Sequence, residues 1–496
     1  MNIMAEMENT IYTENGAKGY KSTGKKLVDL NFKIPSFRTN PDRDLFVEAL
    51  EENKNLALRW LLYLRDIHEG VGERNSFKIF LNELLYQDVK LGKKFLELPL
   101  EDYGRWDDYL SVINKGFGSE VESIVLNKII SQLEKDESSE HPSLLAKWMP
   151  SENTSSALTR CKAIYILKKM GLTPKAYRKL LVKLRKKIDI VESRMSGNEW
   201  EKIDYEKVPS KANLIYKDAF YKHDPVRRSE YLRSLEKGEK KINAQAMFLH
   251  DIVHSYMNTI GWRSDVKPLD LTLEALWEAQ KKPEGFKNTM VVRDGSGSMM
   301  CTIGNSNVSA LDVTDALTLY CAENQEGKFK NYFMTFASNA KCLKLPERAK
   351  SLKAKLEFLH QYTDCSSTNV EAVFDELLET AIEHNAGQED MPENILIISD
   401  MEFNYAMQNP NARLFKQIEK KYKAEGYKLP KLIFWNVNSR TNTIPLTENE
   451  SGVILLSGFS KNLMSMVMSS ELDCYKALVK ELQKSRYDVV DKITEM

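Results

Sequence analysis

Apolar residues in the first half of the chain recur at the spacing of amphipathic helices. Between residues 42 and 100 they fall mostly three or four positions apart, on one face of each helix. The residues of this pattern are Leu45, Leu50, Leu56, Leu58, Leu61, Leu62, Leu64, Phe77, Phe80, Leu81, Leu84 and Leu85. Helix follows helix with no convincing strand, which is typical of an α-solenoid or bundle. We find no strict sequence repeat, so repeat boundaries are not assigned.

Beyond a break at residues 282–285 the pattern changes to alternating strands and helices. Short apolar runs predict strands, and longer runs at helical spacing predict helices between them. The predicted strands are 289–293, 331–336, 341–345, 394–399, 431–437 and 452–456, and the predicted helices are 310–322, 349–359, 370–384 and 412–423. Because parallel strands need helical crossovers, this order predicts a doubly wound α/β fold.

The chain is therefore expected to be multidomain, with an all-α part followed by an α/β part. At 496 residues it is too long for a single hydrophobic core. The predicted parts are an irregular, polar N-terminal arm over 1–36, an all-α domain over 37–284, and an α/β domain over 285–496 that ends in a helix. We expect ordered structure to begin near Pro41, because the preceding segment is rich in Gly, Lys, Asn and Thr.

The composition is that of a globular protein in water, with 42% apolar and 29% charged residues. Acidic and basic residues balance at 71 each, so any affinity for nucleic acid needs a local patch. The six cysteines are scattered without the spacing of a zinc site, which favours a reducing compartment. Neither a secretory signal nor an apolar run of about 18 residues is present. We therefore expect a cytoplasmic protein without a membrane partner.

One stretch concentrates positive charge. Residues 160–187 contain many lysines and arginines and no acidic residue, with Tyr165 and Tyr177 interleaved. Phosphate backbones are the obvious partner of such a surface. The alternative is a solvated helix face that acidic neighbours such as Glu192 and Glu199 balance in space. The candidate nucleic-acid-binding residues are Lys168, Lys169, Lys175, Arg178, Lys179, Lys183, Arg185, Lys186 and Lys187.

The first predicted strand of the α/β domain runs directly into Asp294-Gly295-Ser296-Gly297-Ser298. Its carboxylate and two hydroxyls are hard oxygen ligands, which suit Mg²⁺. The alternative is an ordinary Gly/Ser turn after a strand. Two later segments argue against that alternative: Thr368 lies in a loop before a predicted helix, and Asp400 directly follows the strand over 394–399.

Asp-x-Ser-x-Ser, Thr and Asp on three successive loops resemble the metal-ion-dependent adhesion site (MIDAS) of von Willebrand factor A (VWA) domains. The resemblance implies one divalent cation, Mg²⁺ or another such as Mn²⁺, with a coordination position left for an acidic group of a protein partner. The ligands that it implies, directly or through water, are Asp294, Ser296, Ser298, Thr368 and Asp400. One departure is Met401, where many relatives have glycine, and this affects the expected shape of the third loop.

Several motifs of the helical part carry a second resemblance. They lie at residues 65–74, 103–110, 191–196, 200–205, 208–212 and 240–244. Together with the predicted cation site they resemble a family whose helical part is similar to the TROVE module of the Ro autoantigen proteins. The resemblance covers nearly all of the chain after about Ser36. It implies a ring of HEAT-like helices that binds small structured RNAs and RNA ends on basic surfaces, with the VWA domain closing the ring.

We therefore expect a non-catalytic binding or scaffold protein, with structured or single-stranded RNA on the helical domain and an acidic protein ligand at the cation. A structural or assembly protein that uses VWA contacts without RNA is also open, and the neutral overall charge favours it. A Mg²⁺-dependent phosphoryl-transfer enzyme is disfavoured, because a Walker-type lysine loop is absent and only two carboxylates are firm. His250 and His254 share a helical face, as in zinc proteases. No third ligand follows them, so surface or capping histidines are favoured.

Overall fold

The computed structural model describes residues 3–113, 116–260, 263–336, 340–363, 369–403, 412–447 and 451–494. Contacts within the chain define two compact units. The sheet unit comprises residues 1–57 and 244–484, and the helical unit comprises residues 58–243 and 485–496. The fold is thus a combination of an α/β unit with a helical unit, as the sequence predicts.

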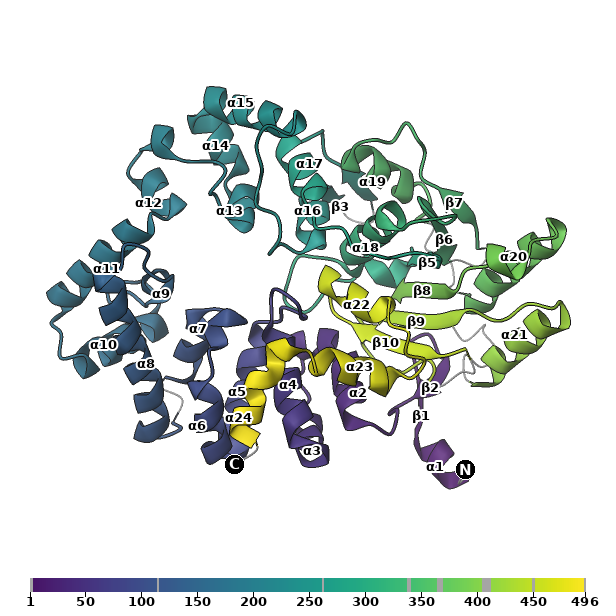
Figure 1. The fold of residues 1–496 in the computed structure, drawn as a ribbon, viewed down its shortest axis with the longest axis horizontal. Helices are drawn as coiled ribbons and strands as arrows, with labels where there is room; N and C mark the ends of the chain where they lie inside the picture. The colour runs from purple at the N-terminus through teal and green to yellow at the C-terminus, as the bar shows by residue number, and fades with distance from the viewer. Residues whose placement is uncertain are drawn as a thin grey trace. The chain divides into compact units, whose positions relative to one another are not determined.

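The centre of the sheet unit is a six-stranded sheet with the order β10-β9-β8-β5-β6-β7 (Figure 1). Its strands are β5 (Thr289–Asp294), β6 (Tyr332–Phe336), β7 (Cys342–Lys344), β8 (Asn394–Ser399), β9 (Lys431–Asn436) and β10 (Val453–Ser457). Neighbouring strands are parallel, except that β7 pairs antiparallel with β6 at one edge. Every residue of β5, β9 and β10 is buried, as expected for parallel strands that are covered on both faces.

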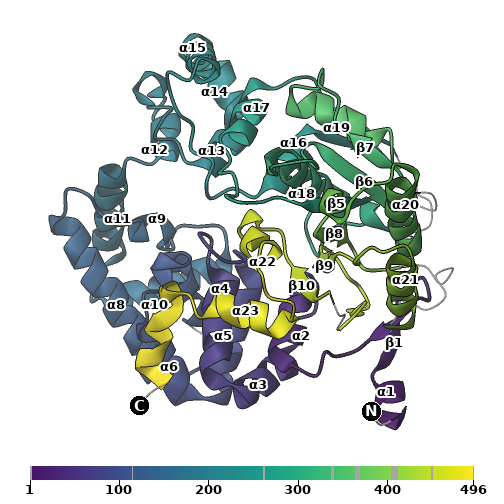
Figure 2. The same ribbon diagram turned by 45° about the vertical axis from the view of Figure 1, so that its right-hand side comes forward.

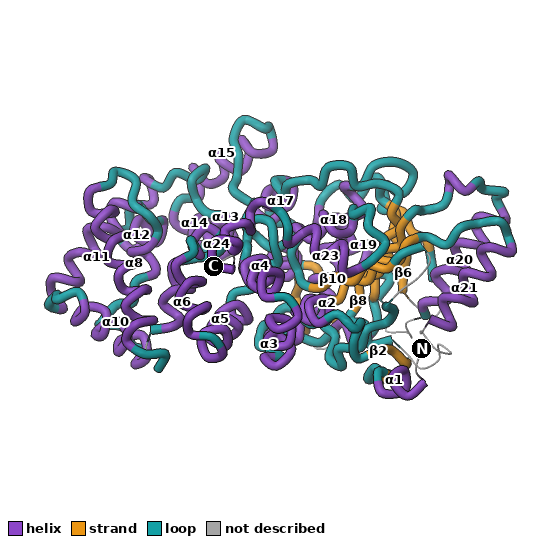
Figure 3. Tube along the Cα trace, turned by 60° about the horizontal axis from the view of Figure 1, so that its bottom comes forward, coloured by secondary structure: helices purple, strands orange, loops and turns teal. Residues whose placement is uncertain are grey.

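Helices cover both faces of this sheet. One face is covered by α18 (Ala310–Asn324), which packs on β5 and β8 and contacts α16 (Leu249–Tyr256). The opposite face carries α20 (Val370–Glu383) and α21 (Ala412–Ala424), which lie side by side (Figures 1 and 2), with the sheet as a layer between the two groups (Figure 3). The remaining helices of the unit are α1 (Ile3–Glu8), α2 (Lys26–Phe32), α3 (Arg43–Glu52), α17 (Leu271–Glu278), α19 (Leu352–His360), α22 (Met464–Val467) and α23 (Cys474–Leu482).

The chain changes direction across the sheet beside β5. It passes through α18 to β6 on one side of β5, and later through α20 to β8 on the other side. The carboxyl ends of β5 and β8 therefore lie at the topological switch point, where open α/β sheets bind their ligands. Arg293 pairs with Ile398 in the register of these two strands, so the residues that follow them emerge together.

The N-terminal segment is not the irregular arm that the sequence predicts. β1 (Thr10–Tyr12) and β2 (Lys18–Tyr20) form an antiparallel hairpin, and Tyr20 forms a further bridge with Ile444. Most of α2 is buried, and the side-chain amide of Asn436 donates to the Phe32 carbonyl at 2.9 Å. These two residues are 404 positions apart. The polar composition of this segment predicts an irregular chain. Its contacts with residues far along the sequence explain why it is ordered.

The compact units also differ from the predicted all-α domain of residues 37–284, because residues 37–57 lie in the sheet unit and so do residues 244–284. The stretch 244–284 belongs to the sheet unit, because α16 packs on α18. It contains a hairpin that the helical pattern does not predict, formed by β3 (Met257–Ile260) and β4 (Arg263–Val266). Residues 485–496, at the end of the predicted α/β domain, belong to the helical unit. There Arg59 pairs with Asp488 at 3.1 Å and with Asp491 at 2.7 Å.

The helical unit contains helices of four to twenty residues, and its described residues form no strand. They are α4 (Lys54–Arg65), within which the division between the units falls, α5 (Asn75–Gln87), α6 (Val89–Glu97), α7 (Trp106–Tyr109), α8 (Ser119–Ser138), α9 (Leu145–Trp148), α10 (Ala157–Lys169), α11 (Pro174–Ile188), α12 (Val191–Ser196), α13 (Ser210–Ile215), α14 (Lys217–His223), α15 (Pro225–Glu236) and α24 (Asp491–Thr494). Across the described parts of both units, no helix combines the length and the apolarity needed to cross a bilayer.

Candidate metal centre

The loop after β5 presents the oxygen atoms that the sequence predicts. Asp294 ends this strand and is completely buried. Its Oδ1 accepts the backbone N–H of Ser296 at 2.9 Å, which closes a tight Asx-type turn. The hydroxyls of Ser296 and Ser298 lie 3.1 Å apart. The turn therefore gathers one carboxylate and two hydroxyls at the carboxyl edge of the sheet.

The loop after β8 brings the second carboxylate to the same place. The Ser399 hydroxyl donates to Asp294 Oδ2 at 2.6 Å, which ties the ends of the two strands together. Asp400 follows directly, is 1% exposed, and is hydrogen-bonded to the side chain of Ser298. Its Oδ1 also accepts the backbone N–H of Glu402 at 3.2 Å. Asp294, Ser296, Ser298 and Asp400 thus converge, whereas Thr368 lies outside the described residues.

The electrostatics of this cluster suit a cation. Burial, together with the neighbouring Asp400 carboxylate, raises the pKa of Asp294 to about 7. Burial also raises the pKa of Asp400, although Arg440 acts in the opposite direction. Two buried carboxylates that repel each other are stabilised by a positive ion between them. The donor set of carboxylates and hydroxyls fits a hard divalent cation such as Mg²⁺ or Mn²⁺.

Met401 shows how the third loop forms without a glycine. Its φ is 60°, in the left-handed region that glycine favours, and its side chain is 1% exposed. The backbone N–H of Met401 donates to the Ser399 hydroxyl at 3.0 Å. Burial of the methionine side chain offsets the backbone strain, so a methionine at this position leaves Asp400 in place.

A buried arginine that sequence reasoning missed supports the same edge of the sheet. Arg293 Nε donates to Asp315 Oδ1 of α18 at 2.6 Å, and both side chains are at most 1% exposed. His360 Nε2 lies 3.0 Å from Asp315 Oδ2, and Arg293 Nη2 donates to the Thr363 hydroxyl at 3.0 Å. Burial alone raises the pKa of Asp315, but Arg293 and His360 bring it below the ordinary value. An arginine inside an apolar strand was the available sequence signal.

The basic helices α10 and α11 expose most of the lysines that the sequence singles out. Several of the predicted residues nevertheless have partners within the unit. Arg178 pairs with Glu152 at 2.6 Å, and Lys183 pairs with Glu137 at 2.8 Å. Lys169 lies over the ring of Tyr165. This part of the surface fits the alternative reading, in which acidic neighbours balance the positive charge.

Arg185 and Lys187 hold the ends of other helices. The half-buried guanidinium of Arg185 donates to the carbonyls of Ala146 and Met149, each at 2.9 Å, next to α9. Lys187 donates to the Glu137 carbonyl at 2.6 Å, near the end of α8. Among the described residues, the candidate lysines that are exposed and whose side chains have no ion-pair, hydrogen-bond or ring partner are Lys168, Lys175, Lys179 and Lys186.

The two histidines of α16 have structural surroundings. His250 is 4% exposed and stacks on Phe248, so it is a core residue and not a surface one. His254 Nδ1 lies 2.9 Å from Asp312 Oδ2 at the start of α18. In the described parts of the chain, no group of three or more His, Cys, Asp or Glu side chains could hold a metal ion. Both histidines thus have contacts within the fold.

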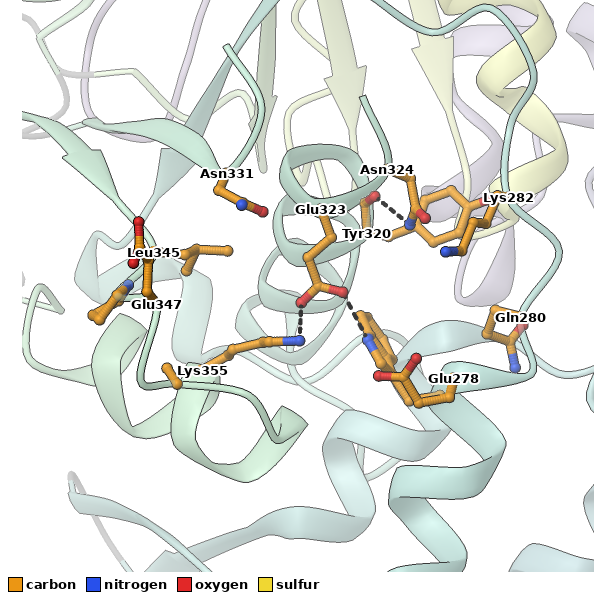
Figure 4. Close-up of a pocket in the computed structure, with 13 residues that line it drawn as sticks. Glu278, Gln280, Lys282, Tyr320, Glu323, Asn324, Asn331, Leu345, Glu347 and Lys355 are labelled. Carbon is orange, nitrogen blue, oxygen red and sulfur yellow. Dashed lines mark hydrogen bonds and ion pairs between the residues drawn. The ribbon is translucent and has the colours of Figure 1, made fainter. Parts of the chain in front are cut away.

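A polar cavity of about 280 Å³ lies at the opposite edge of the sheet, beside the end of α18 and the start of β6 (Figure 4). Glu323 points across it, pairing with Lys355 at 2.9 Å and accepting the indole N–H of Trp277 at 3.1 Å. Glu323 and Lys355 thus neutralise each other inside the cavity. None of the residues that line it belongs to the oxygen cluster.

Fold and site together define a class of protein, in which a helical unit accompanies an α/β unit that carries carboxylates and hydroxyls at its switch point. The chain belongs to the same family as Uncharacterized protein L728 of Acanthamoeba polyphaga mimivirus. The two are 30% identical over 514 residues, which cover 94% of this chain and 86% of that protein. Residues 288–494 match a domain of unknown function, DUF7788, and residues 167–291 match another, DUF2828.

A solved structure, the crystal structure of Deinococcus radiodurans RO (RSR) protein, is similar at a TM-score of 0.35 and 11% identity. The similarity covers 96% of both chains. A TM-score of this size does not assign a fold.

Proposed function

We propose that this protein is a non-catalytic binding scaffold whose sheet unit is a VWA-type domain that captures an acidic group of a protein partner through a divalent cation. The convergence of Asp294, Ser296, Ser298 and Asp400 at the switch point carries the proposal. Asp294, Asp400, Ser296 and Ser298 offer fewer side chains than the six oxygen ligands that a cation such as Mg²⁺ requires, so a coordination position would stay open for a partner. An incoming carboxylate would complete the ligand set.

The chain's own residues have distinct tasks in this proposal. Asp294 and Asp400 supply the charge, and burial keeps water from weakening their field. Ser296 and Ser298 supply neutral oxygens whose positions the turn fixes. Ser399 orients Asp294 through its hydroxyl.

Cation binding is tested by calorimetric titration of the purified full chain with Mn²⁺ and Mg²⁺. We expect one site in the wild-type protein, and its loss in Asp294→Asn and Ser296→Ala. Glu284→Gln, an exposed acidic residue of the same unit, is the matched control and should bind as the wild type does. Equal binding by the wild type and Asp294→Asn would refute the site.

The helical unit carries a second proposed activity, the binding of RNA. It is supported by the four exposed lysines without partners and by the resemblance of the helical motifs to TROVE modules. Lysines of this kind contact phosphates and make affinity fall with salt. The HEAT-type arrangement of the helices is part of the same proposal.

The test measures binding of a short RNA hairpin and of a single strand over a range of salt concentrations. Four Lys→Gln changes, at Lys168, Lys175, Lys179 and Lys186, should weaken the salt dependence of binding. For a single strand, the negative slope of log K against log salt should become smaller in magnitude by about 3. The control removes equal charge elsewhere in the helical unit, through Gln at Lys222, Arg233, Lys237 and Lys241. Equal binding by the wild type and both variants would remove these lysines from the RNA site, and absence of binding by the wild type would make an assembly protein without RNA the better description.

A further inference from the structure

Arg440 lies between the oxygen cluster and Glu14, which belongs to the N-terminal hairpin segment of residues 9–22. Its Nη1 donates to Asp400 Oδ2 at 3.1 Å, and its Nε donates to Glu14 Oε2 at 2.7 Å. The side chain is 26% exposed, so this guanidinium is partly withdrawn from water. One oxygen of a proposed cation ligand thus already accepts a hydrogen bond from a positive group of the protein itself.

The buried carboxylate of Glu402 binds the backbone on both sides of the Arg440–Glu14 contact. Its Oε1 accepts the backbone N–H groups of Arg440 at 2.8 Å and Thr441 at 2.9 Å. Its Oε2 accepts the backbone N–H of Glu14 at 2.9 Å. Glu402 is 1% exposed and lies two positions after Asp400, so the third loop, the loop after β9 and the N-terminal segment are joined at one point.

The N-terminal segment, residues 9–22, is docked by several further contacts. The Thr13 hydroxyl donates to the Phe403 carbonyl at 2.6 Å, and the Asn15 side chain donates to the Glu402 carbonyl at 2.6 Å. The backbones of Tyr20 and Ile444 exchange two hydrogen bonds of 2.9 Å. These contacts fix the backbone around Glu14, so its carboxylate is held next to Arg440.

We propose that Arg440 is an internal cation that competes with the divalent cation for Asp400, and that the docked N-terminal segment favours Arg440 through Glu14. This inference rests on the proposed cation site. A divalent ion held by Asp294 and Asp400 is repelled by a guanidinium that shares the Asp400 carboxylate. Entry of the ion therefore weakens the Arg440–Asp400 contact. By linkage it also weakens the docking of residues 9–22.

The experiment combines Mn²⁺ titration with hydrogen exchange of peptides that cover residues 9–22. Arg440→Gln should bind Mn²⁺ more tightly than the wild type, by about tenfold at low salt, which is the effect expected for loss of one charge near a divalent ion. Arg440→Lys keeps the charge and should stay closer to the wild type. Arg348→Gln, an exposed arginine of the same unit, is the control for loss of charge and should not change the affinity.

In the wild-type protein, Mn²⁺ should speed the exchange of residues 9–22, and this measurement does not depend on the folding of any variant. In Arg440→Gln, Mn²⁺ should leave that exchange unchanged. Equal Mn²⁺ affinity in wild type and Arg440→Gln, together with loss of binding in Asp294→Asn, would overturn the competition and leave the cation site standing. Unchanged exchange in the wild type at saturating Mn²⁺ would overturn the link to the N-terminal segment. Absence of Mn²⁺ binding in every protein, Arg440→Gln included, would overturn the cation site itself.

Discussion

Neutralising Asp294 should make the cation-free protein more stable. Its carboxylate is fully buried beside the carboxylate of Asp400, so the two like charges repel each other when no cation is bound. The variant Asp294→Asn keeps the size of the side chain and removes its charge. We therefore expect a higher free energy of unfolding for the variant than for the wild type when divalent ions are chelated.

The magnitude follows from the environment of Asp294. A tenfold change in proton affinity is about 1.4 kcal/mol, so a rise of the pKa from 3.8 to about 7 corresponds to roughly 4 kcal/mol. Asparagine offers one acceptor oxygen where Asp294 accepts from Ser296 and Ser399, and this costs about 1–2 kcal/mol. The expected net gain near neutral pH is about 2 kcal/mol.

Urea unfolding with a chelator, and then with Mn²⁺, measures this gain. At a concentration about one hundred times its Kd, Mn²⁺ should stabilise the wild type by about 2.7 kcal/mol and leave Asp294→Asn unchanged. The order of stability of the two proteins should therefore reverse or nearly so. A variant that is less stable than the wild type in chelator would refute the reasoning, because it would mean that the buried charges do not repel each other.

Three further predictions concern the same unit. Asp315→Asn leaves Arg293 buried without its ion-pair partner and should destabilise the protein by about 3–5 kcal/mol in urea unfolding, opposite in sign to Asp294→Asn. Met401→Gly relieves a left-handed backbone worth about 1 kcal/mol but removes a buried side chain worth about 2–3 kcal/mol, so thermal unfolding should show a net loss of about 1–2 kcal/mol. Burial lowers the pKa of Lys461 from 10.5 to about 8, so the unfolded chain binds more protons between these values. Stability should rise with pH across that window, and Lys461→Gln should remove the rise.

The sequence predicts the sheet well because its parallel strands are nearly continuous apolar runs between amphipathic helices. It also predicts which oxygens gather, since residues at the ends of β5 and β8 share one edge whatever the loops do. Arg440 and Glu14 could not be predicted in this way, because they lie 426 positions apart and neither belongs to a local motif. The ordered structure near the N-terminus could not be predicted for the same reason, because its partners lie about 400 positions away in the sequence.

Two of the helical motifs, those at residues 65–74 and 103–110, are by contrast explained by packing. Arg65 Nε donates to Asp108 Oδ2 at 2.7 Å, and both side chains are at most 2% exposed. A Cβ atom at Gly104 would overlap both of these groups, so only glycine lets the arginine pass. The first motif supplies the arginine, and the second supplies the glycine and the aspartate. The pair therefore joins α4 to α7 in the helical unit, and these residues have no side chain free to contact RNA. These two motifs thus carry residues that pack helices together, and the RNA proposal depends on the exposed lysines of α10 and α11.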